Sequence, residues 1–403
     1  MSIQQKIKAL AKQNANEIIE IRRHLHQNPE LSYHEYNTAK FIAEKLKAIG
    51  IIPSEGIANT GLVALIEGKN PSSRTVALRA DIDALPIIEA NQISYKSQNN
   101  GVMHACGHDV HTASLLGVAK ILNNIKEDFE GTVKLIFQPA EEVAPGGASL
   151  MIEAGVLENP TPKSMLGQHV APNIPVGKIG FREGLYMASA DELYVTVKGK
   201  GGHGAMPEML IDPILIASHI IIALQQIVSR NANPKTPSVL SFGKFIANGA
   251  TNVIPDEVKI DGTFRTLNEE WRWDALKKMK KMAEGIAEAM GGSCEFFIQK
   301  GYPFLKNNPE LTRRMKQNAI DFMGEENVID LDIWMAAEDF AYYTQVTDAC
   351  FYRLGTRNEA QGIISGVHTP TFNIDESALE IGAGLMSWLA LSELAEKYNH
   401  FKK

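Results

Sequence analysis

Residues 104–111 read HACGHDVH and bring three histidines, one cysteine and one aspartate into one short stretch. Imidazole, thiolate and carboxylate groups are the side chains that bind transition metals in proteins. The spacing within CGH matches no zinc-finger pattern, so the segment is either half of a metal site or an ordinary polar turn. The position of the other polar clusters in the chain decides between these two interpretations.

Those clusters lie at the ends of predicted strands. Short apolar runs predict buried strands at 75–80, 131–138, 164–170 and 350–355. The polar residues that end or follow them are Asp81, Glu141, Glu142, His169 and His368. In open α/β sheets ligands bind outside the carboxyl ends of the strands, so we expect these residues to meet Cys106 and His108 there.

Each residue alone has an ordinary structural explanation. Glu141 and Glu142 read singly as a solvated loop, Cys106 as a small buried side chain, and His104 and His111 as helix caps or partners of a metal ligand. The coincidence of several clusters at strand ends favours the metal site. Histidines with paired carboxylates suit a two-metal hydrolytic site, where most groups bind ions and one stays unbound to move protons.

Two domains must position these residues. Buried strands alternate with predicted helices such as 113–122 and 378–398, which indicates an α/β fold with a mostly parallel sheet flanked by helices. Residues 184–298 instead follow the order β-α-β-β-α-β of a ferredoxin-like α+β unit. We therefore expect a catalytic metal-binding domain at 1–183 and 299–403, with an inserted lid domain at 184–298.

Composition narrows the class of protein. The chain has 403 residues and a formal net charge of -7, which argues against nucleic acid or an anionic membrane as a partner. We expect no membrane-spanning run, and the N-terminus reads as an amphipathic helix rather than a signal peptide. The scattered thiols cannot form a disulfide framework, so we expect a cytoplasmic protein; they are Cys106, Cys294 and Cys350.

An ordered series of motifs covers almost the whole chain: RRHLHQNPELSYHE (22–35), RADIDALPI (79–87), MHACGHDVHTA (103–113), FQPAEE (137–142), GKGGHGAMP (199–207), NVIPDEV (252–258), GTFRT (262–266), AAEDFAYY (336–343) and HTPTFNIDE (368–376). On these motifs the chain resembles the aminoacylase-type family of two-metal peptidases and amidohydrolases. The most similar branch is that of the hippurate hydrolases. It includes N-acyl-amino-acid amidohydrolases, N-acetyl-diaminopimelate deacetylase and plant auxin-conjugate hydrolases.

The resemblance implies a ligand set for two divalent ions. The implied metal ligands are Cys106, His108, Glu142, His169 and His368. Asp109 is a rival ligand that ranks below Cys106 and His108. A thiolate favours Zn²⁺ by its softness, whereas the resemblance also admits Mn²⁺, Co²⁺ or Ni²⁺.

The resemblance also implies roles in catalysis. Glu141 resembles the general base, and Asp81 resembles the aspartate that orients a metal-binding histidine, with Asp83 as its rival. His203 resembles a donor from the lid that stabilises the oxyanion, supplied in related enzymes by the partner subunit. The residues implied to bind substrate are Asn252 and Arg265. Seen singly, these three lid residues are more often structural.

The implied reaction is metal-dependent hydrolysis of N-acyl amino acids, with N-acetyl, N-benzoyl or similar groups, to a carboxylic acid and a free amino acid. The implied assembly is a homodimer through the lid, around residues 213–247. The alternatives are a dipeptidase or carboxypeptidase on the same scaffold, a non-catalytic relative, and a thiol enzyme that uses Cys106 with His108 or His111. The acyl group, the amino acid and the native metal stay open.

Overall fold

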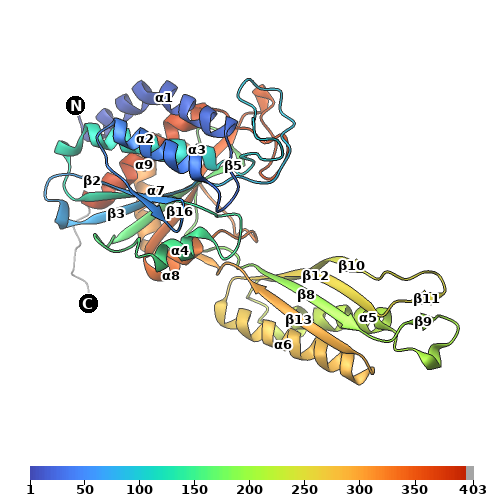
Figure 1. Ribbon diagram of the computed structural model, residues 1–403. Coiled ribbons are helices and arrows are strands. Elements are labelled where there is room, and N and C mark those ends of the chain that lie inside the picture. The colour runs from blue at the N-terminus through green and yellow to red at the C-terminus, as the bar shows by residue number, and fades with distance from the viewer. Residues whose placement is uncertain (396–403) are drawn as a thin grey trace, which may run out of the picture. The chain divides into compact units, whose positions relative to one another are not determined.

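The computed structural model describes residues 1–395, and the chain divides into two compact units (Figure 1). Unit 1 comprises Met1–Gly184, Lys306–Asp332 and Tyr342–Lys403. Unit 2 comprises Leu185–Leu305 and Ile333–Ala341. The chain crosses from one unit to the other four times, after Gly184, Leu305, Asp332 and Ala341. The first crossing lies in the short strand β7 (Gly184–Met187) and the second in β14 (Leu305–Asn307).

Unit 1 is built on an eight-stranded sheet in the order β1-β2-β4-β3-β5-β16-β6-β15. The strands are β1 (Ser54–Ile57), β2 (Gly61–Glu67), β3 (Thr75–Asp81), β4 (Thr132–Gln138), β5 (Ser164–Pro175), β6 (Ile179–Phe181), β15 (Val328–Asp330) and β16 (Asp348–Arg357). The central run β4-β3-β5-β16 is parallel, as is β6-β15, and the remaining pairs are antiparallel. Every residue of β3 and β4 is buried, as expected of parallel strands covered on both faces.

Helices cover this sheet. They are α1 (Ile3–Gln27), α2 (Tyr36–Ala48), α3 (His108–Asn124), α4 (Gly147–Glu153), α7 (Pro309–Met323), α8 (Ala341–Val346) and α9 (Ser377–Ala395). Figure 1 shows α1, α2 and α3 on one side of the sheet, with α4 and α8 on the other. The predicted α/β fold with flanking helices is therefore confirmed. The last residues of the helix expected at 378–398 lie outside the described part of the chain.

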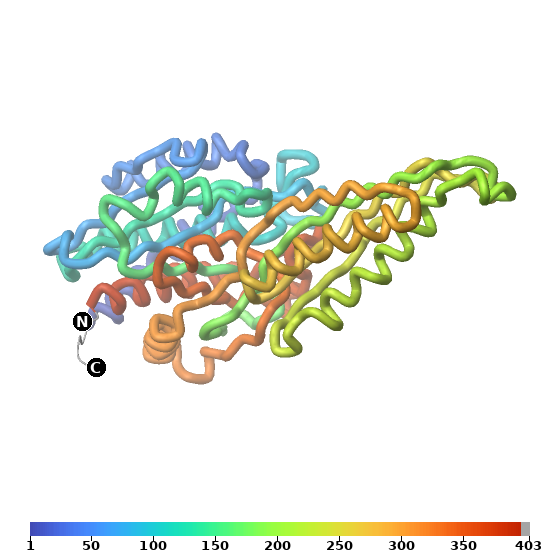
Figure 2. Tube along the Cα trace, turned by 90° about the horizontal axis from the view of Figure 1, so that it is seen from below, coloured from blue at the N-terminus to red at the C-terminus, as the bar shows by residue number. Residues whose placement is uncertain are grey.

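Unit 2 is an antiparallel sheet in the order β10-β12-β8-β13, and the order of its elements along the chain is that of a ferredoxin-like fold, as predicted. Its main elements are β8 (Asp191–Lys198), α5 (Pro213–Gln226), β10 (Ser238–Ile246), β12 (Glu257–Thr266), α6 (Glu269–Ala289) and β13 (Ser293–Lys300). A two-stranded sheet joins β9 (Gly202–His203) to β11 (Val253–Ile254). Helices α5 and α6 contact each other and lie on one face of the sheet (Figures 1 and 2).

The alternation along β8 explains this packing. Leu193, Val195 and Val197 are buried in the core of unit 2, whereas Tyr194 and Lys198, on the opposite side of the strand, are exposed. A period of two places one set of side chains under the helices and the other on the open face of the sheet.

Two helical segments among the described residues are long and apolar enough to cross a membrane by length and composition alone, contrary to the expectation from the sequence. They are Pro213–Asn231, which continues α5 through a π-helical turn, and Ser377–Ala395. The most apolar stretch of the second is 72% buried inside the protein, as in a core helix, whereas that of the first is only 33% buried. The α5 segment therefore presents an apolar surface.

Two turns beside the sheet are shaped by close contacts. Gly107 precedes α3 with φ +84°, and a Cβ there would lie 2.5 Å from Cγ2 of Val170, so only glycine fits. After β4, a Cβ on Gly147 would lie 1.8 Å from the carbonyl oxygen of Pro139. The absence of a side chain at these two glycines lets the backbone pack closely before His108 and after Glu141.

We predict that Gly147→Ala lowers the free energy of unfolding by about 1–3 kcal/mol, because the added methyl group displaces the backbone after β4. The matched control is Gly285→Ala in α6, where an added Cβ meets nothing within 4 Å. It should be neutral or stabilising by up to about 1 kcal/mol, since alanine is the better helix former. Chemical denaturation of both variants checks this, and equal midpoints would contradict it.

Candidate metal centre

The site forms at the carboxyl end of the parallel strands of unit 1. Asp81 closes β3, and Arg79 in β3 pairs with Gly167 in β5, so His169 stands at the level of Asp81. Helix α3 starts at His108, immediately after Cys106 and Gly107. The convergence expected from the strand ends is therefore present among residues that lie far apart in the sequence.

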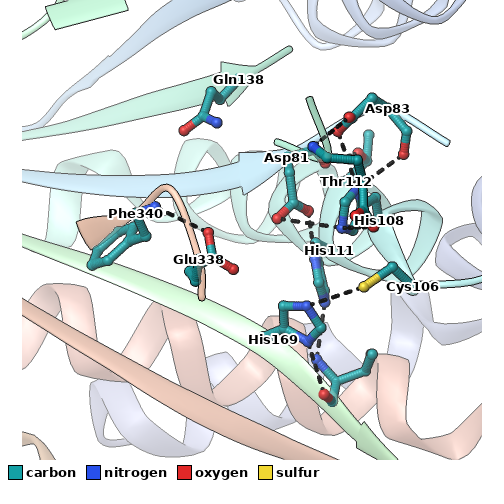
Figure 3. Close-up of polar contacts among 12 residues, drawn as sticks. Asp81, Asp83, Cys106, His108, His111, Thr112, Gln138, His169, Glu338 and Phe340 are labelled. Atoms are coloured by element: carbon teal, nitrogen blue, oxygen red, sulfur yellow. Dashed lines mark hydrogen bonds and ion pairs between the residues drawn. The ribbon is translucent and has the colours of Figure 1, made fainter. Parts of the chain in front are cut away.

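The predicted ligands fall into two overlapping groups that share Cys106. One group holds Cys106, His108 and His169, and the other holds Cys106, Glu142 and His368; within each group the donor atoms lie within 4.8 Å of one another. Sγ of Cys106 lies 3.5 Å from Nε2 of His169 and 3.3 Å from Nε2 of His368. Figure 3 shows Cys106, His108 and His169 pointing toward a common centre. The sharing of the thiol matches a pair of adjacent ions.

The ring orientation of two histidines leaves the correct nitrogen available. Nδ1 of His108 lies 2.9 Å from the backbone carbonyl oxygen of Asp83 and 3.1 Å from its side-chain Oδ1. Since both of these oxygens are acceptors, Nδ1 carries the proton. Nδ1 of His169 likewise donates to the carbonyl of Val170 at 2.8 Å. In each ring Nε2 keeps its lone pair for a ligand, which is the usual arrangement of metal-binding histidines.

Unsatisfied buried atoms test whether an ion fits here. Among the described residues, no hydrogen-bond partner reaches Nε2 of His108, although this atom is buried; Oε1 of Glu142, which is also buried, lies 3.2 Å from Nε2 of His368. Buried polar atoms are rarely left without a partner, and both are good donors to a divalent cation. The residues present therefore fit a metal centre.

Asp81 and Asp83 contact different histidines. Asp83 makes the contact to Nδ1 of His108, whereas Asp81 lies 3.8 Å from Nε2 of that ring. Oδ1 of Asp81 instead accepts from Nδ1 of His111 at 2.5 Å, and Oδ2 accepts from Arg79 at 2.6 Å. Burial works to raise the pKa of Asp81, but the charge of Arg79 and the histidines lowers it well below its usual value. The geometry favours Asp83 as the residue that orients His108.

His111 is a structural partner in this arrangement. The backbone N–H of Val170 donates to its Nε2 at 2.9 Å, while its Nδ1 donates to Asp81. Both ring nitrogens are therefore used, which leaves no lone pair for a metal. The sequence allowed this role for His111 but did not identify its partners.

Asp109 faces away from the two ligand groups. Its Oδ2 accepts from Nε of Arg22 at 2.9 Å and contacts Nδ1 of His26 at 2.8 Å, and its Oδ1 accepts from the backbone N–H of Val110. Burial would raise the pKa of Asp109, but Arg22 and His26 hold it well below its usual range. This pairing disfavours Asp109 as a ligand.

The ligands carry protons that a metal would displace. Burial raises the pKa of the Cys106 thiol, and the carboxylate of Glu142 raises it further. Hydrogen bonds with Cys106 and Glu142 raise the pKa of His368 to about 10. Since a metal binds the thiolate and the neutral imidazole, metal binding must release these protons, and affinity should rise with pH.

Glu141 lies beside the ligand groups without belonging to either. Its side chain is buried, and a carboxylate oxygen lies within 4.8 Å of the donor atoms of His108 and Glu142. The preceding residue, Ala140, has φ +51°, a left-handed conformation that a non-glycine residue adopts only under constraint. The turn directs Glu141 to a position from which it can exchange a proton within the site.

The remaining predicted residues lie in unit 2. His203 on β9 and Asn252 are both exposed, and they are neighbours because the N–H of Gly204 donates to the carbonyl of Asn252 at 2.9 Å. Arg265 is half-buried near the other end of β12, where it donates to the carbonyl of Met335 at 3.3 Å. The structure thus brings His203 and Asn252 together, with Arg265 apart from them.

The chain is similar to known proteins over most of its length. The sequence model of Peptidase family M20/M25/M40 matches residues 77–392. The N-acyl-L-amino acid amidohydrolase of Geobacillus stearothermophilus is 43% identical over 316 residues, which are 78% of this chain and 85% of that protein. Thermostable carboxypeptidase 2 of Saccharolobus solfataricus is 40% identical over 394 residues, 97% of this chain and 99% of that protein.

A solved structure is similar over nearly the whole chain. The Bacillus subtilis YxeP protein, described as a dinuclear metal-binding peptidase from the M20 family, matches with a TM-score of 0.81 at 36% identity. The match covers 95% of this chain and 99% of that one.

We predict that Cys106→Ala lowers the zinc or manganese bound per chain to half or less, because it removes the donor that both ligand groups share. The control is Cys350→Ala, which removes a buried thiol from β16 that belongs to neither group. Metal analysis of the purified proteins makes the comparison. Unchanged metal content in Cys106→Ala would remove the thiol from the ligand set.

Proposed function

The chain belongs to peptidase family M20/M25/M40, and on that premise we propose that it hydrolyses the amide bond of N-acyl amino acids, releasing a carboxylic acid and a free amino acid. One observation carries the proposal, namely the convergence of five potential metal donors beside a further buried carboxylate. The donors are Cys106, His108, Glu142, His169 and His368, and the carboxylate is Glu141. A non-catalytic relative would have no need to keep all of them.

Two divalent ions held by these donors complete the site in this proposal. The thiolate supports Zn²⁺, and the carboxylate and imidazoles also accept Mn²⁺, Co²⁺ or Ni²⁺. When bound, such ions supply Lewis acidity, which polarises the amide carbonyl and acidifies water. Burial raises the pKa of Cys106, whereas a thiol nucleophile needs a lowered pKa, so the site supports metal catalysis over thiol catalysis.

The chain's own residues then orient groups and move protons. Glu141 accepts the proton of the attacking water and donates it to the departing amine. Asp83 holds the ring of His108 through Nδ1, and Asp81 holds His111. From the lid, we infer that His203 donates to the oxyanion and that Asn252 and Arg265 bind substrate.

A carboxypeptidase or dipeptidase is the alternative. The Saccharolobus carboxypeptidase matches 97% of this chain, and hydrolysis of a peptide bond is the same amide chemistry, which metal ions and a general base also catalyse. The two activities differ in the group attached to the amino acid, which the residues of the metal centre do not select.

We also infer a homodimer in the cytoplasm. The apolar surface of α5 includes the exposed side chains of Leu215 and Ile222. Edge strand β10 adds the exposed side chains of Val239, Phe245 and Ile246. A second copy of the chain would cover such a surface.

The direct test measures amine release from a panel of N-acetyl, N-benzoyl and indole-acetyl amino acids, N-acetyl-diaminopimelate and several dipeptides. The protein is supplied with Zn²⁺ or Mn²⁺, and a chelator serves as control. We expect release from N-acyl amino acids that the chelator abolishes. Release from dipeptides alone would replace the proposal by the alternative activity.

Glu141→Gln is the matched inactive variant, because it keeps the shape of the side chain and removes its basicity. We expect metal content to stay at the wild-type level while turnover falls about 10²-fold or more. Metal analysis and kinetics on the best substrate measure both quantities. Wild-type turnover in this variant would exclude Glu141 as the general base.

A further inference from the structure

The segment 22–35, which joins the end of α1 to the start of α2, carries polar side chains that are buried. Arg22, His26 and Glu35 are 0% exposed and Ser32 is 8% exposed. Burying such groups costs free energy unless each is hydrogen-bonded. Their partners lie on the loops that carry the metal centre, as three sets of contacts show.

The first contact reaches two metal ligands through Asp83. The hydroxyl of Ser32 donates to Oδ2 of Asp83 at 2.6 Å. The same Oδ2 accepts the backbone N–H of Glu142 at 3.0 Å, while Oδ1 lies 3.1 Å from Nδ1 of His108. The backbone supports this contact, since the N–H of Ala84 donates to the carbonyl of Glu30 at 2.8 Å. Ser32 therefore fixes the carboxylate that orients both His108 and Glu142.

The second contact holds the turn before Glu141. Oε1 of Glu35 accepts the backbone N–H of Ala140 at 2.8 Å, and its Oε2 accepts the hydroxyl of Thr60 at 2.7 Å. Ala140 has the left-handed φ of +51° and no side chain that could form this bond itself. A strained residue persists only when its surroundings constrain it, and the buried carboxylate of Glu35 supplies that constraint.

The third contact holds the start of α3. Nε of Arg22 donates to Oδ2 of Asp109 at 2.9 Å, and Nδ1 of His26 lies 2.8 Å from the same atom. Nε2 of His26 lies 3.1 Å from Oε1 of Glu89, so the ring bridges two carboxylates. Asp109 directly follows the ligand His108, and its position fixes the first turn of the helix.

We propose that segment 22–35 is a brace for the metal centre, and that Ser32 and Glu35 are positioning residues for the metal ligands and for the general base, respectively. This inference rests on the proposed function for its kinetic part. Ser32 acts through Asp83 on His108 and Glu142. Glu35 acts through the backbone of Ala140 on Glu141. None of the brace side chains belongs to a ligand group among the described residues.

Four variants separate positioning from stability. Ser32→Ala removes the donor to Asp83, and Glu35→Leu removes the acceptor for Ala140. Glu35→Gln keeps a side-chain oxygen that can accept the backbone N–H of Ala140. Its amide N–H can donate to the hydroxyl oxygen of Thr60. The matched control is Ser387→Ala, because Ser387 is also buried and its hydroxyl donates to the carbonyl of Ala383 within α9, outside the brace.

Three measurements are made on each variant. Zinc affinity is measured by competition with a chromophoric chelator, kcat and KM are measured on the best substrate of the panel, and thermal unfolding is followed for the metal-free protein. We expect Ser32→Ala to weaken zinc binding about 10- to 100-fold. We expect Glu35→Leu to lower kcat about 10- to 100-fold with little change in KM or zinc affinity, and Glu35→Gln to restore kcat.

The control Ser387→Ala should match the wild type in zinc affinity and kcat. The proposal is overturned if all variants only lower the unfolding temperature and keep wild-type zinc affinity and kcat, or if Glu35→Gln fails to restore kcat. Should Glu35→Leu not fold, the zinc affinity of Ser32→Ala decides. Absence of turnover in the wild type would contradict the proposed function, while the zinc measurement would still test the brace.

Discussion

The structure depends on keeping Nε2 of two buried imidazoles free and directed toward one thiol. His108 and His169 achieve this because their Nδ1 atoms donate to fixed acceptors, Asp83 and the carbonyl of Val170. Rotation of either ring would bury an unpaired nitrogen and remove a donor from the shared group around Cys106. The parallel sheet, the start of α3 and the turn after β4 all serve to hold these directions.

This arrangement lowers the stability of unit 1. His108 leaves a buried ring nitrogen without a hydrogen bond from the described residues, and Ala140 adopts a left-handed conformation. Such features are unfavourable in a core, and they cluster where a protein binds or reacts. The buried side chains of segment 22–35 offset this cost, because they form hydrogen bonds with the loops that carry the metal centre.

The sequence predicts the strand ends well and their fine geometry less well. Periodicity identifies the buried strands, and the polar residues at their ends indicate where a site lies, whereas the division into metal ligands and general base is what the family resemblance implies. The sequence alone does not tell whether Asp81 or Asp83 orients His108. Residues two apart share a face only while the strand continues, and β3 ends at Asp81. Arg22 and His26 are four apart on the buried face of α1, a spacing that places them together but does not reveal Asp109 as their partner.

X-ray absorption spectroscopy at the zinc edge of the zinc-loaded protein tests the central claim most directly. The shared thiolate predicts a sulfur scatterer at about 2.3 Å beside nitrogen and oxygen scatterers at about 2.0–2.1 Å. A shell of nitrogen and oxygen alone would show that Cys106 does not bind the metal. In that case the convergence of the two ligand groups on one thiol would need another explanation.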